Sequence, residues 1–271
     1  MVGTRAETFF SYAVLTLFSL VVVLPVGWLL LAAMSPTANA GVDLADIRWA
    51  NFADAWVQAD FGRHLLNSLI ICVGVVCLVG VVSILAGYGL TILAMPGAKI
   101  IFPLFLAGIM IPLEGILVPL YYNLRSVGLT SSLFGLVLAH SGLGVSFGVF
   151  WMRASLRAIP RELVESAELD GAGRMRMLSS IVLPVVRPSL VTMVLLTFMW
   201  TWNDYFLAFV LVNEESKMPV TLALGSFSTR YTQQLNLMAA AAVLVALPVL
   251  VLYMFFQRQF IQGVMSGALK G

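Results

Sequence analysis

Six long apolar runs constrain this chain more than any other feature of its sequence. A membrane-crossing helix needs about 20 apolar residues to span roughly 30 Å of hydrocarbon, and each run is close to that length or longer. Because lipid offers no partners for unpaired backbone groups, each run should be helical. We therefore predict an all-α integral membrane protein with a single domain, 1–271, and six spans near residues 9–34, 65–93, 100–121, 133–151, 189–212 and 237–256.

The composition supports this class and argues against others. Hydrophobic residues make up 61% of the 271 residues and charged residues only 10%, whereas a soluble domain carries about 25% charged residues. The net charge of +2 and the lack of a basic stripe with interleaved aromatics argue against nucleic-acid binding. Cys72 and Cys77 lie about 140° apart around one helix, so we expect no disulfide between them. With two cysteines and two histidines in all, we expect no metal site.

The first apolar run has a second interpretation. Ala38-Asn39-Ala40 resembles the small-residue site that ends a secretory signal peptide. The apolar stretch before it spans about 26 residues, however, whereas the apolar region of a signal peptide has about 7–15. The length therefore favours a retained first span over a cleaved signal.

Lysine and arginine predict the sidedness of the chain. With the N-terminus in the cytoplasm, the outer loops, mainly 35–64 and 213–236, hold five of the fifteen basic residues. The other ten are cytoplasmic, namely Arg5, Lys99, Arg153, Arg157, Arg161, Arg174, Arg176, Arg187, Arg258 and Lys270. This excess predicts cytoplasmic N- and C-termini. It also places the polar loop 153–188 on the cytoplasmic face.

The loop 153–188 is a charged interruption between two spans. Pro160 suits the first turn of a helix, and Gly171 and Gly173 suit its end. A second short helix is predicted from Arg174 to Pro184, where proline should stop it. The pattern indicates two helices lying on the membrane surface. A solvated loop resting on lipid headgroups is the alternative.

The spacing within this loop resembles the EAA motif of the permeases of ABC importers. Its parts are Glu165-Ser166-Ala167, then Gly171, then Ile181-Val182-Leu183-Pro184, and Asp170-Gly171-Ala172 and Pro188 fit the longer form. Ser166 stands where the motif has alanine. Three further segments resemble carbohydrate-type, or maltose-type, permeases: Trp202-Asn203-Asp204-Tyr205-Phe206, Met238-Ala239-Ala240-Ala241, and the C-terminal stretch from Gln257.

This resemblance implies a type I ABC importer permease fold with a cytoplasmic coupling helix, in a bacterial or archaeal cytoplasmic membrane. The expected function is that of a permease subunit in an ATP-driven, binding-protein-dependent sugar importer. The implied partners are a second homologous permease, a dimer of a cytoplasmic ABC ATPase and an extracytoplasmic solute-binding protein. The three lysines, Lys99, Lys217 and Lys270, lie outside any G-x-x-x-x-G-K-[ST] motif. We therefore expect no enzymatic activity and no cofactor in this chain, with ATP and Mg²⁺ bound by the partner ATPase.

Two sets of contact residues follow from the resemblance. The ATPase-coupling set is Glu165, Ser166, Ala167, Asp170, Gly171, Ala172, Leu183 and Pro184. Within it, Glu165 and Asp170 should make polar contacts, Ala167 close packing and Gly171 the turn. The second set lies in the outer loop that would reach the binding protein: Gly225, Ser226, Phe227 and Tyr231, with the two aromatic rings able to stack on sugars. An ordinary connecting loop remains an equal alternative for the second set.

Carboxylates at membrane depth are candidate substrate-path residues, since buried charge in a span is costly. They are Glu114, between two prolines, and Asp204 with its neighbour Asn203. His140 is better explained as a helix–helix contact. An ion-coupled secondary transporter is the main alternative, but it would predict broken helices or paired carboxylates repeated in two halves. The span cores lack lysine and arginine, which favours a neutral sugar without naming it.

Overall fold

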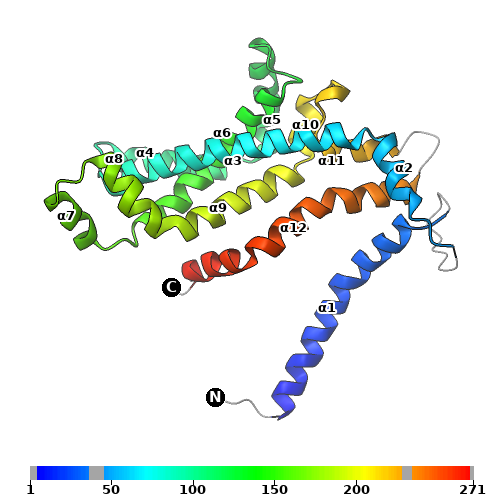
Figure 1. Cartoon of the computed structure of the whole chain (residues 1–271). Helices are drawn as coiled ribbons and strands as arrows, with labels where there is room; N and C mark the ends of the chain where they lie inside the picture. Colours follow the sequence, from blue (N-terminus) through cyan, green and yellow to red (C-terminus); the bar gives the residue numbers. More distant parts are fainter. Residues whose placement is uncertain (1–4, 37–45, 228–233, 269–271) are drawn as a thin grey trace. The chain divides into compact units, whose positions relative to one another are not determined.

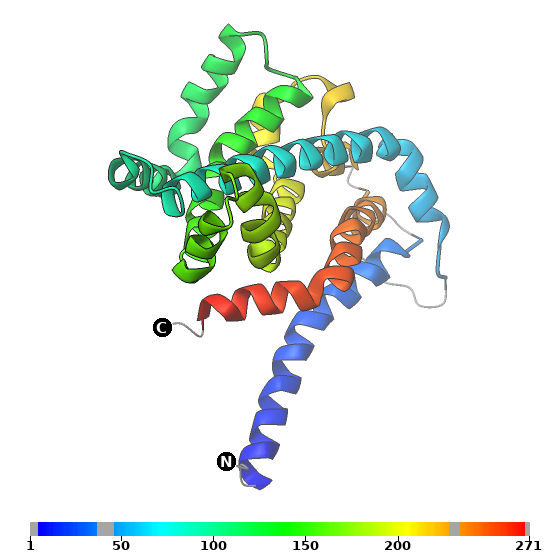
Figure 2. The same ribbon diagram turned by 60° about the vertical axis from the view of Figure 1, so that its left-hand side comes forward.

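A computed structural model describes residues 5–36, 46–227 and 234–268, with side chains described from residue 9 and up to residue 259. Every regular element in these ranges is a helix, as Figure 1 shows with labels and Figure 2 from a second direction. The all-α prediction is therefore confirmed. By its internal contacts the chain divides into two compact units, residues 1–62 with 223–248 and residues 63–222 with 249–271.

The first unit has a small core built mainly from alanine. It contains α1 (Arg5–Ala33), α2 (Ala50–Gln58), the 3₁₀ turn η3 (Leu224–Phe227) and the start of α12 (Leu235–Ala268). The side-chain amide of Asn51 donates to the carbonyls of Ala33 and Ser35 at 2.9 and 2.8 Å, which fixes α2 on the end of α1. The long apolar part of α1 from Phe9 contributes almost nothing to this core. Its side chains are exposed, as expected of a helix that faces lipid.

The second unit holds most of the helices. They are α3 (Phe61–Thr91), α4 (Ala98–Met110), α5 (Leu113–Ser126), α6 (Leu133–Leu156), α7 (Arg161–Leu169), α8 (Arg174–Met177), the π-helical turn η1 (Leu178–Val182), α9 (Leu183–Asn203), α10 (Phe206–Leu211) and η2 (Glu215–Lys217). The four-residue α11 (Val220–Ala223) straddles the boundary between the units.

Small residues bring α3 and α6 together in this unit. A Cβ on Gly148 of α6 would collide with the Ser83 hydroxyl and lie 3.1 Å from Val79, both on α3. One turn earlier, Gly144 also faces Val79. Helices in lipid associate through such close packing, because lipid removes the hydrophobic driving force between them. The absence of side chains at these glycines thus sets how closely the two spans approach.

The third predicted span, 100–121, is not one continuous helix. Residues 100–121 belong instead to α4 and α5, which meet at a bend of 100°. Ile111 has an extended backbone, φ −73° and ψ 119°, as expected for a residue before proline. Pro112 then starts the new helix. Five helices are long and apolar enough to span a membrane in the described ranges, or six if this bent pair forms one span.

The fifth predicted span, 189–212, is also wrong at both ends. The helix already begins at Arg174 and runs to Asn203. Pro184 does not stop it, because the five-residue π turn η1 precedes it and the Leu183 N–H bonds to the Leu178 carbonyl. A proline lacks the N–H that α-helical bonding requires, and a wider turn accommodates it. The polar loop therefore ends at Gly173 rather than at residue 188.

Two other helices extend beyond the predicted spans. α6 runs past residue 151 to Leu156, and α12 covers Leu235–Ala268 instead of 237–256. The predicted outer loop 35–64 contains α2 and the start of α3, and the loop 213–236 contains η2, α11 and η3. Both cysteines are free, Cys72 buried and Cys77 exposed.

Candidate functional site

The polar loop after α6 forms the short helix α7, with Pro160 at its start. Its end has a defined hydrogen-bond pattern. Gly171 has φ +74°, the Gly171 N–H donates to the Glu168 carbonyl at 3.0 Å, and the Ala172 N–H donates to the Ala167 carbonyl at 2.9 Å. This pair of bonds is the Schellman ending, which favours glycine because only glycine adopts positive φ without strain. The chain is thus turned sharply from α7 into α8.

One face of α7 is buried within the second unit. Ala167 is only 4% exposed and belongs to a cluster with Tyr88 of α3, Met152 of α6 and Val182 before α9. The alanine therefore packs against this chain's own helices. It is not open to the backbone of a partner, although its small size does allow the close packing that the sequence indicated.

The remainder of α7 is largely exposed, and Glu165, Ser166 and Asp170 are all exposed. Two apolar side chains are unusually open for a polar loop: Leu169 is 89% exposed and Met175 is 71% exposed. Exposed apolar side chains such as this leucine and methionine favour a protein–protein contact.

Leu183 and Pro184, the last two residues of the predicted coupling set, begin α9. Leu183 is half-buried against the same cluster as Ala167, and Pro184 is exposed. They lie one π turn beyond α8. α9 continues from them to the far end of the second unit, where Figure 1 shows α10. The loop and the far end of the unit are thus joined by one continuous helical segment.

At that far end the chain breaks at Asp204. Its carboxylate accepts hydrogen bonds from the N–H groups of Leu207 and Ala208 at 3.5 and 3.2 Å, which caps the first turn of α10. The other partner of the carboxylate is His140 of α6, whose Nε2 lies 3.6 Å from Asp204 Oδ2. The predicted helix–helix role of His140 is therefore realised through a carboxylate.

The side chains of Asp204 and His140 line a small cavity with two further polar residues. These are Ser68 of α3 and Thr201 of α9, and the remaining lining is apolar: Ile71, Leu136, Ala208 and Pro219. Three helices and the break between α9 and α10 thus bring four polar side chains together inside the second unit. Such a convergence inside a membrane-spanning bundle is a candidate functional site.

The other candidate path residues lie elsewhere. Glu114 is in the first turn of α5, just after the bend at Pro112, and it is exposed. Asn203 is also exposed, and its amide donates to the Met199 carbonyl one turn back. Neither residue lines the Asp204 cavity. The structure therefore does not bring the three predicted path residues into one site.

A polar strip at the start of α3 was missed from the sequence. His64 Nδ1 lies 2.8 Å from the Met218 carbonyl, and the Asn67 amide donates to the same carbonyl at 3.0 Å. The Ser68 hydroxyl accepts from the Val220 N–H at 2.8 Å. These contacts hold the segment after α10 against α3. Their sequence signal was three polar residues at helical spacing at the entrance of an apolar run.

The predicted binding-protein residues have different environments. Gly225 and Ser226 are exposed, but Phe227 is buried in the alanine-rich core of the first unit. The expectation that this ring is open to stack on a sugar is therefore wrong, because its apolar surface is already covered by protein. Tyr231 lies outside the described residues.

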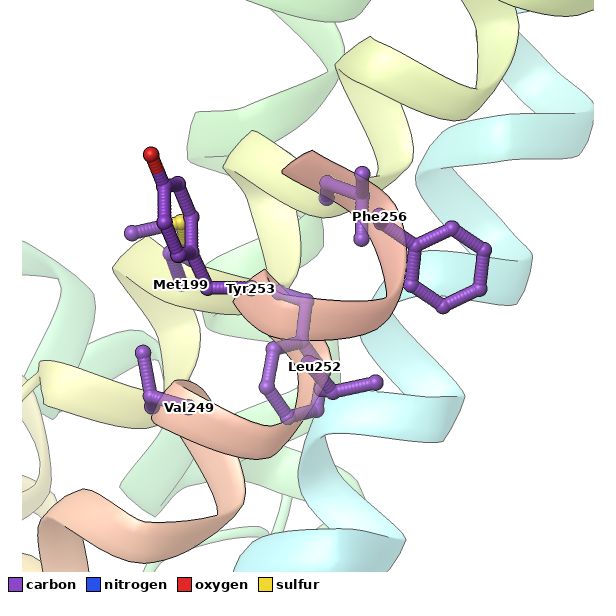
Figure 3. Close-up of a pocket in the computed structure, with 7 residues that line it drawn as sticks. Met199, Val249, Leu252, Tyr253 and Phe256 are labelled. Atoms are coloured by element: carbon purple, nitrogen blue, oxygen red, sulfur yellow. The ribbon is translucent and has the colours of Figure 1, made fainter. Parts of the chain in front are cut away.

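An apolar groove lies between α9 and α12 in the second unit. Figure 3 shows its lining, which is Leu195, Phe198, Met199, Val249, Leu252, Tyr253 and Phe256. The Tyr253 hydroxyl is the one polar side-chain group in this lining. The groove thus offers little to a hydroxylated solute and is not a candidate sugar site.

Comparison with known proteins agrees with this architecture. A family described as "Binding-protein-dependent transport system inner membrane component" matches residues 81–266, which include α7, the π turn and the Asp204 break. The chain belongs to this family. It is a multi-pass permease component of an importer, and this membership favours the ABC importer over the ion-coupled carrier.

Individual relatives of the permease cover nearly its whole length. The diacetylchitobiose uptake permease NgcG of Streptomyces coelicolor is 30% identical over 266 residues, covering 96% of this chain and 88% of its own. The maltodextrin permease MdxG of Bacillus subtilis is 32% identical, covering 96% and 95%. A bacterial ABC transporter that imports alginate has the same fold, with a TM-score of 0.83 at 21% identity over 96% of this chain and 99% of that one.

Proposed function

We propose that this permease is one of two membrane subunits of an ATP-driven, binding-protein-dependent sugar importer. It forms half of the translocation pathway and couples to a separate ATPase through the loop from Glu165 to Pro184. Three relatives carry names that refer to uptake of diacetylchitobiose, of maltodextrin and of melibiose, raffinose and stachyose. These names support a carbohydrate substrate. The lack of lysine and arginine in the span cores supports a neutral one.

The observation that carries the proposal is the construction of α7. Its back packs through Ala167 against residues of α3, α6 and the α8–α9 segment, while its front exposes Glu165, Asp170 and Leu169. A force applied to the front of α7 therefore acts on three spans at once. Coupling needs this kind of element, because a partner shifts a conformational equilibrium only through contacts that differ between the two states.

The assembly then follows from the family. A second, homologous permease would complete the pathway, and two copies of an ABC ATPase would bind ATP and Mg²⁺ in the cytoplasm beneath α7. A solute-binding protein would deliver the sugar to the outer face. A solved bacterial alginate ABC transporter, in complex with an alginate pentasaccharide-bound periplasmic protein, is a neighbour with a TM-score of 0.69 and supports the binding-protein part of this assembly.

Purification from native membranes tests this proposal. The tagged protein should bring down a second permease and an ATPase, and proteoliposomes with the matching binding protein should accumulate sugar when supplied with ATP and Mg²⁺. Diacetylchitobiose, maltotriose, raffinose and trehalose form a suitable panel, with phosphorylated glucose as the charged comparison. Uptake that follows a proton or sodium gradient and ignores ATP would refute the proposal.

A further inference from the structure

The last turn of α3 is held rigidly against α6. A Cβ placed on Gly87 would lie 3.0 Å from Leu156 Cδ1, 3.2 Å from Met152 Cβ and 3.4 Å from the Arg153 backbone nitrogen. The last turn of α3 therefore packs closely against α6 at this glycine. The next residue, Tyr88, is only 4% exposed and projects into the cluster that also contains Ala167 of α7. Its backbone is thus part of a rigid pair of spans.

The hydroxyl of Tyr88 makes one specific contact across the unit. It donates to the carbonyl oxygen of Arg174 at 2.9 Å, linking residues 86 positions apart. Arg174 is the first residue of α8, directly after the turn at Gly171 and Gly173. The same carbonyl also accepts the N–H of Leu178, the first residue of the π turn. A carbonyl has two lone pairs, so it can accept both donors.

This hydrogen bond lies where α7 is connected to α9. Apolar packing around Ala167 and Met177 also holds α7 in place, but such packing is non-directional and allows sliding. A hydrogen bond fixes both distance and direction. The π turn that follows has i+5 hydrogen bonding and ends at Val182, two residues before Pro184, so we expect the segment to deform there. The Tyr88 hydroxyl binds at Arg174, which lies on the N-terminal side of the π turn, next to the polar loop.

We propose that Tyr88 is a positioning residue for coupling. Its hydroxyl fixes the Gly173–Arg174 turn on the rigid α3–α6 pair, so that a displacement of α7 moves α3, α6 and α9 together. Without the hydroxyl, displacement of α7 would be absorbed at the π turn and would reach α9 incompletely. This inference rests on the proposed function, because it assigns a role within the same coupling loop.

Tyr88→Phe is the test, because it removes the hydroxyl and keeps the ring. The complete transporter is reconstituted with its partner chains, and ATP hydrolysis is measured together with uptake of the panel sugar that the wild-type protein accumulates best. Hydrolysis should stay within twofold of wild type, while sugar accumulated per ATP should fall at least fivefold. An unchanged ratio would overturn the inference.

Two controls separate positioning from general stability. Tyr122→Phe removes the same atom from a ring of α5 that is 61% exposed, and it should leave the ratio unchanged. Replacement of Tyr88 by p-aminophenylalanine retains an N–H donor at the same place and should restore coupling. If sugar accumulated per ATP falls in Tyr88→Phe and p-aminophenylalanine does not restore it, the hydroxyl contact is also rejected.

Hydrogen–deuterium exchange supplies a measurement that requires neither the sugar nor the ATPase. In Tyr88→Phe, exchange of the amides from Met175 to Leu178 should become about tenfold faster, with α10 unchanged. Equal exchange in the two proteins rejects the Tyr88 contact. Failure of the proposed function has a different signature, since the wild-type protein itself would then show no ATP-dependent uptake.

Discussion

At the scale of single residues, backbone conformation and hydrogen-bond capacity explain the most informative positions. Gly171 occupies a left-handed turn, which sequence reasoning predicted because a glycine followed a short polar helix. Asp204 caps α10 and faces His140, which the sequence did not indicate, because the two residues are 64 positions apart and meet only in the folded chain. Local chemistry was thus predictable, and long-range pairing was not.

The turn at Gly171 gives the first prediction. Gly171→Val should strain the turn by about 1–2 kcal/mol, because a residue with a Cβ disfavours positive φ. We expect the variant to insert in the membrane and to lose most ATP-dependent uptake, measured in proteoliposomes alongside co-purification of the ATPase. Gly173→Ala is the matched control, since Gly173 has φ −65° and a Cβ added there would meet no atom within 4 Å. Equal uptake by both variants would contradict the role of the turn.

The cap at Asp204 gives the second prediction. Asp204→Ala removes the acceptor for two N–H groups and should cost about 1 kcal/mol, equivalent to a fall of roughly 2–4 °C in the melting temperature. Asp204→Asn keeps one acceptor oxygen and should cost less. Thermal unfolding of the purified protein in detergent measures both. An alanine variant that melts at the wild-type temperature would show that the cap is dispensable.

At the scale of elements, prolines and glycines decide where helices bend and how closely they pack. Pro112 separates α4 from α5. Pro184, in contrast, follows a π turn whose wider hydrogen bonding accommodates it, and the helix stays continuous. Proline thus had opposite consequences at two sites. Hydropathy cannot distinguish them, because the outcome depends on whether neighbouring turns can satisfy the freed carbonyl groups.

The α3–α6 contact gives the third prediction. Gly148→Leu should destabilise the protein by about 1–3 kcal/mol, because the added side chain has no space beside Ser83 and Val79. Gly142→Leu is the matched control on the same helix, where a Cβ meets nothing within 4 Å. Yield of monodisperse protein and melting temperature in detergent compare the two variants. Equal behaviour would show that the two helices are not in close contact at Gly148.

At the scale of the whole molecule, the distribution of basic residues predicts which end of the second unit faces the cytoplasm and the proposed ATPase. The ten basic residues assigned to the cytoplasmic side outnumber the five outside. The polar loop that contains α7 and the segment after α10 that contacts α3 lie at opposite ends of the second unit in Figure 1. Each is therefore expected to face a different compartment.

Sidedness gives the fourth prediction. In a background with Cys72→Ser and Cys77→Ser, the exposed residues Glu165 and Glu214 are each replaced by cysteine. A membrane-impermeant maleimide should label Glu214→Cys in intact spheroplasts, and it should label Glu165→Cys only after permeabilisation. The reverse pattern would invert the proposed orientation.

The sequence by itself determined that the chain is helical and membrane-embedded, that a polar loop with a short helix interrupts the apolar runs and which family the chain resembles. These features depend on hydropathy and local spacing, which are written in consecutive residues. Tertiary structure alone decided that Phe227 is buried, that Ala167 packs inside the chain, that His140 meets Asp204 and that Tyr88 holds Arg174. The reason is physical: burial and hydrogen bonding between distant segments depend on how helices pack, and in lipid an apolar pattern does not reveal which face of a helix meets protein.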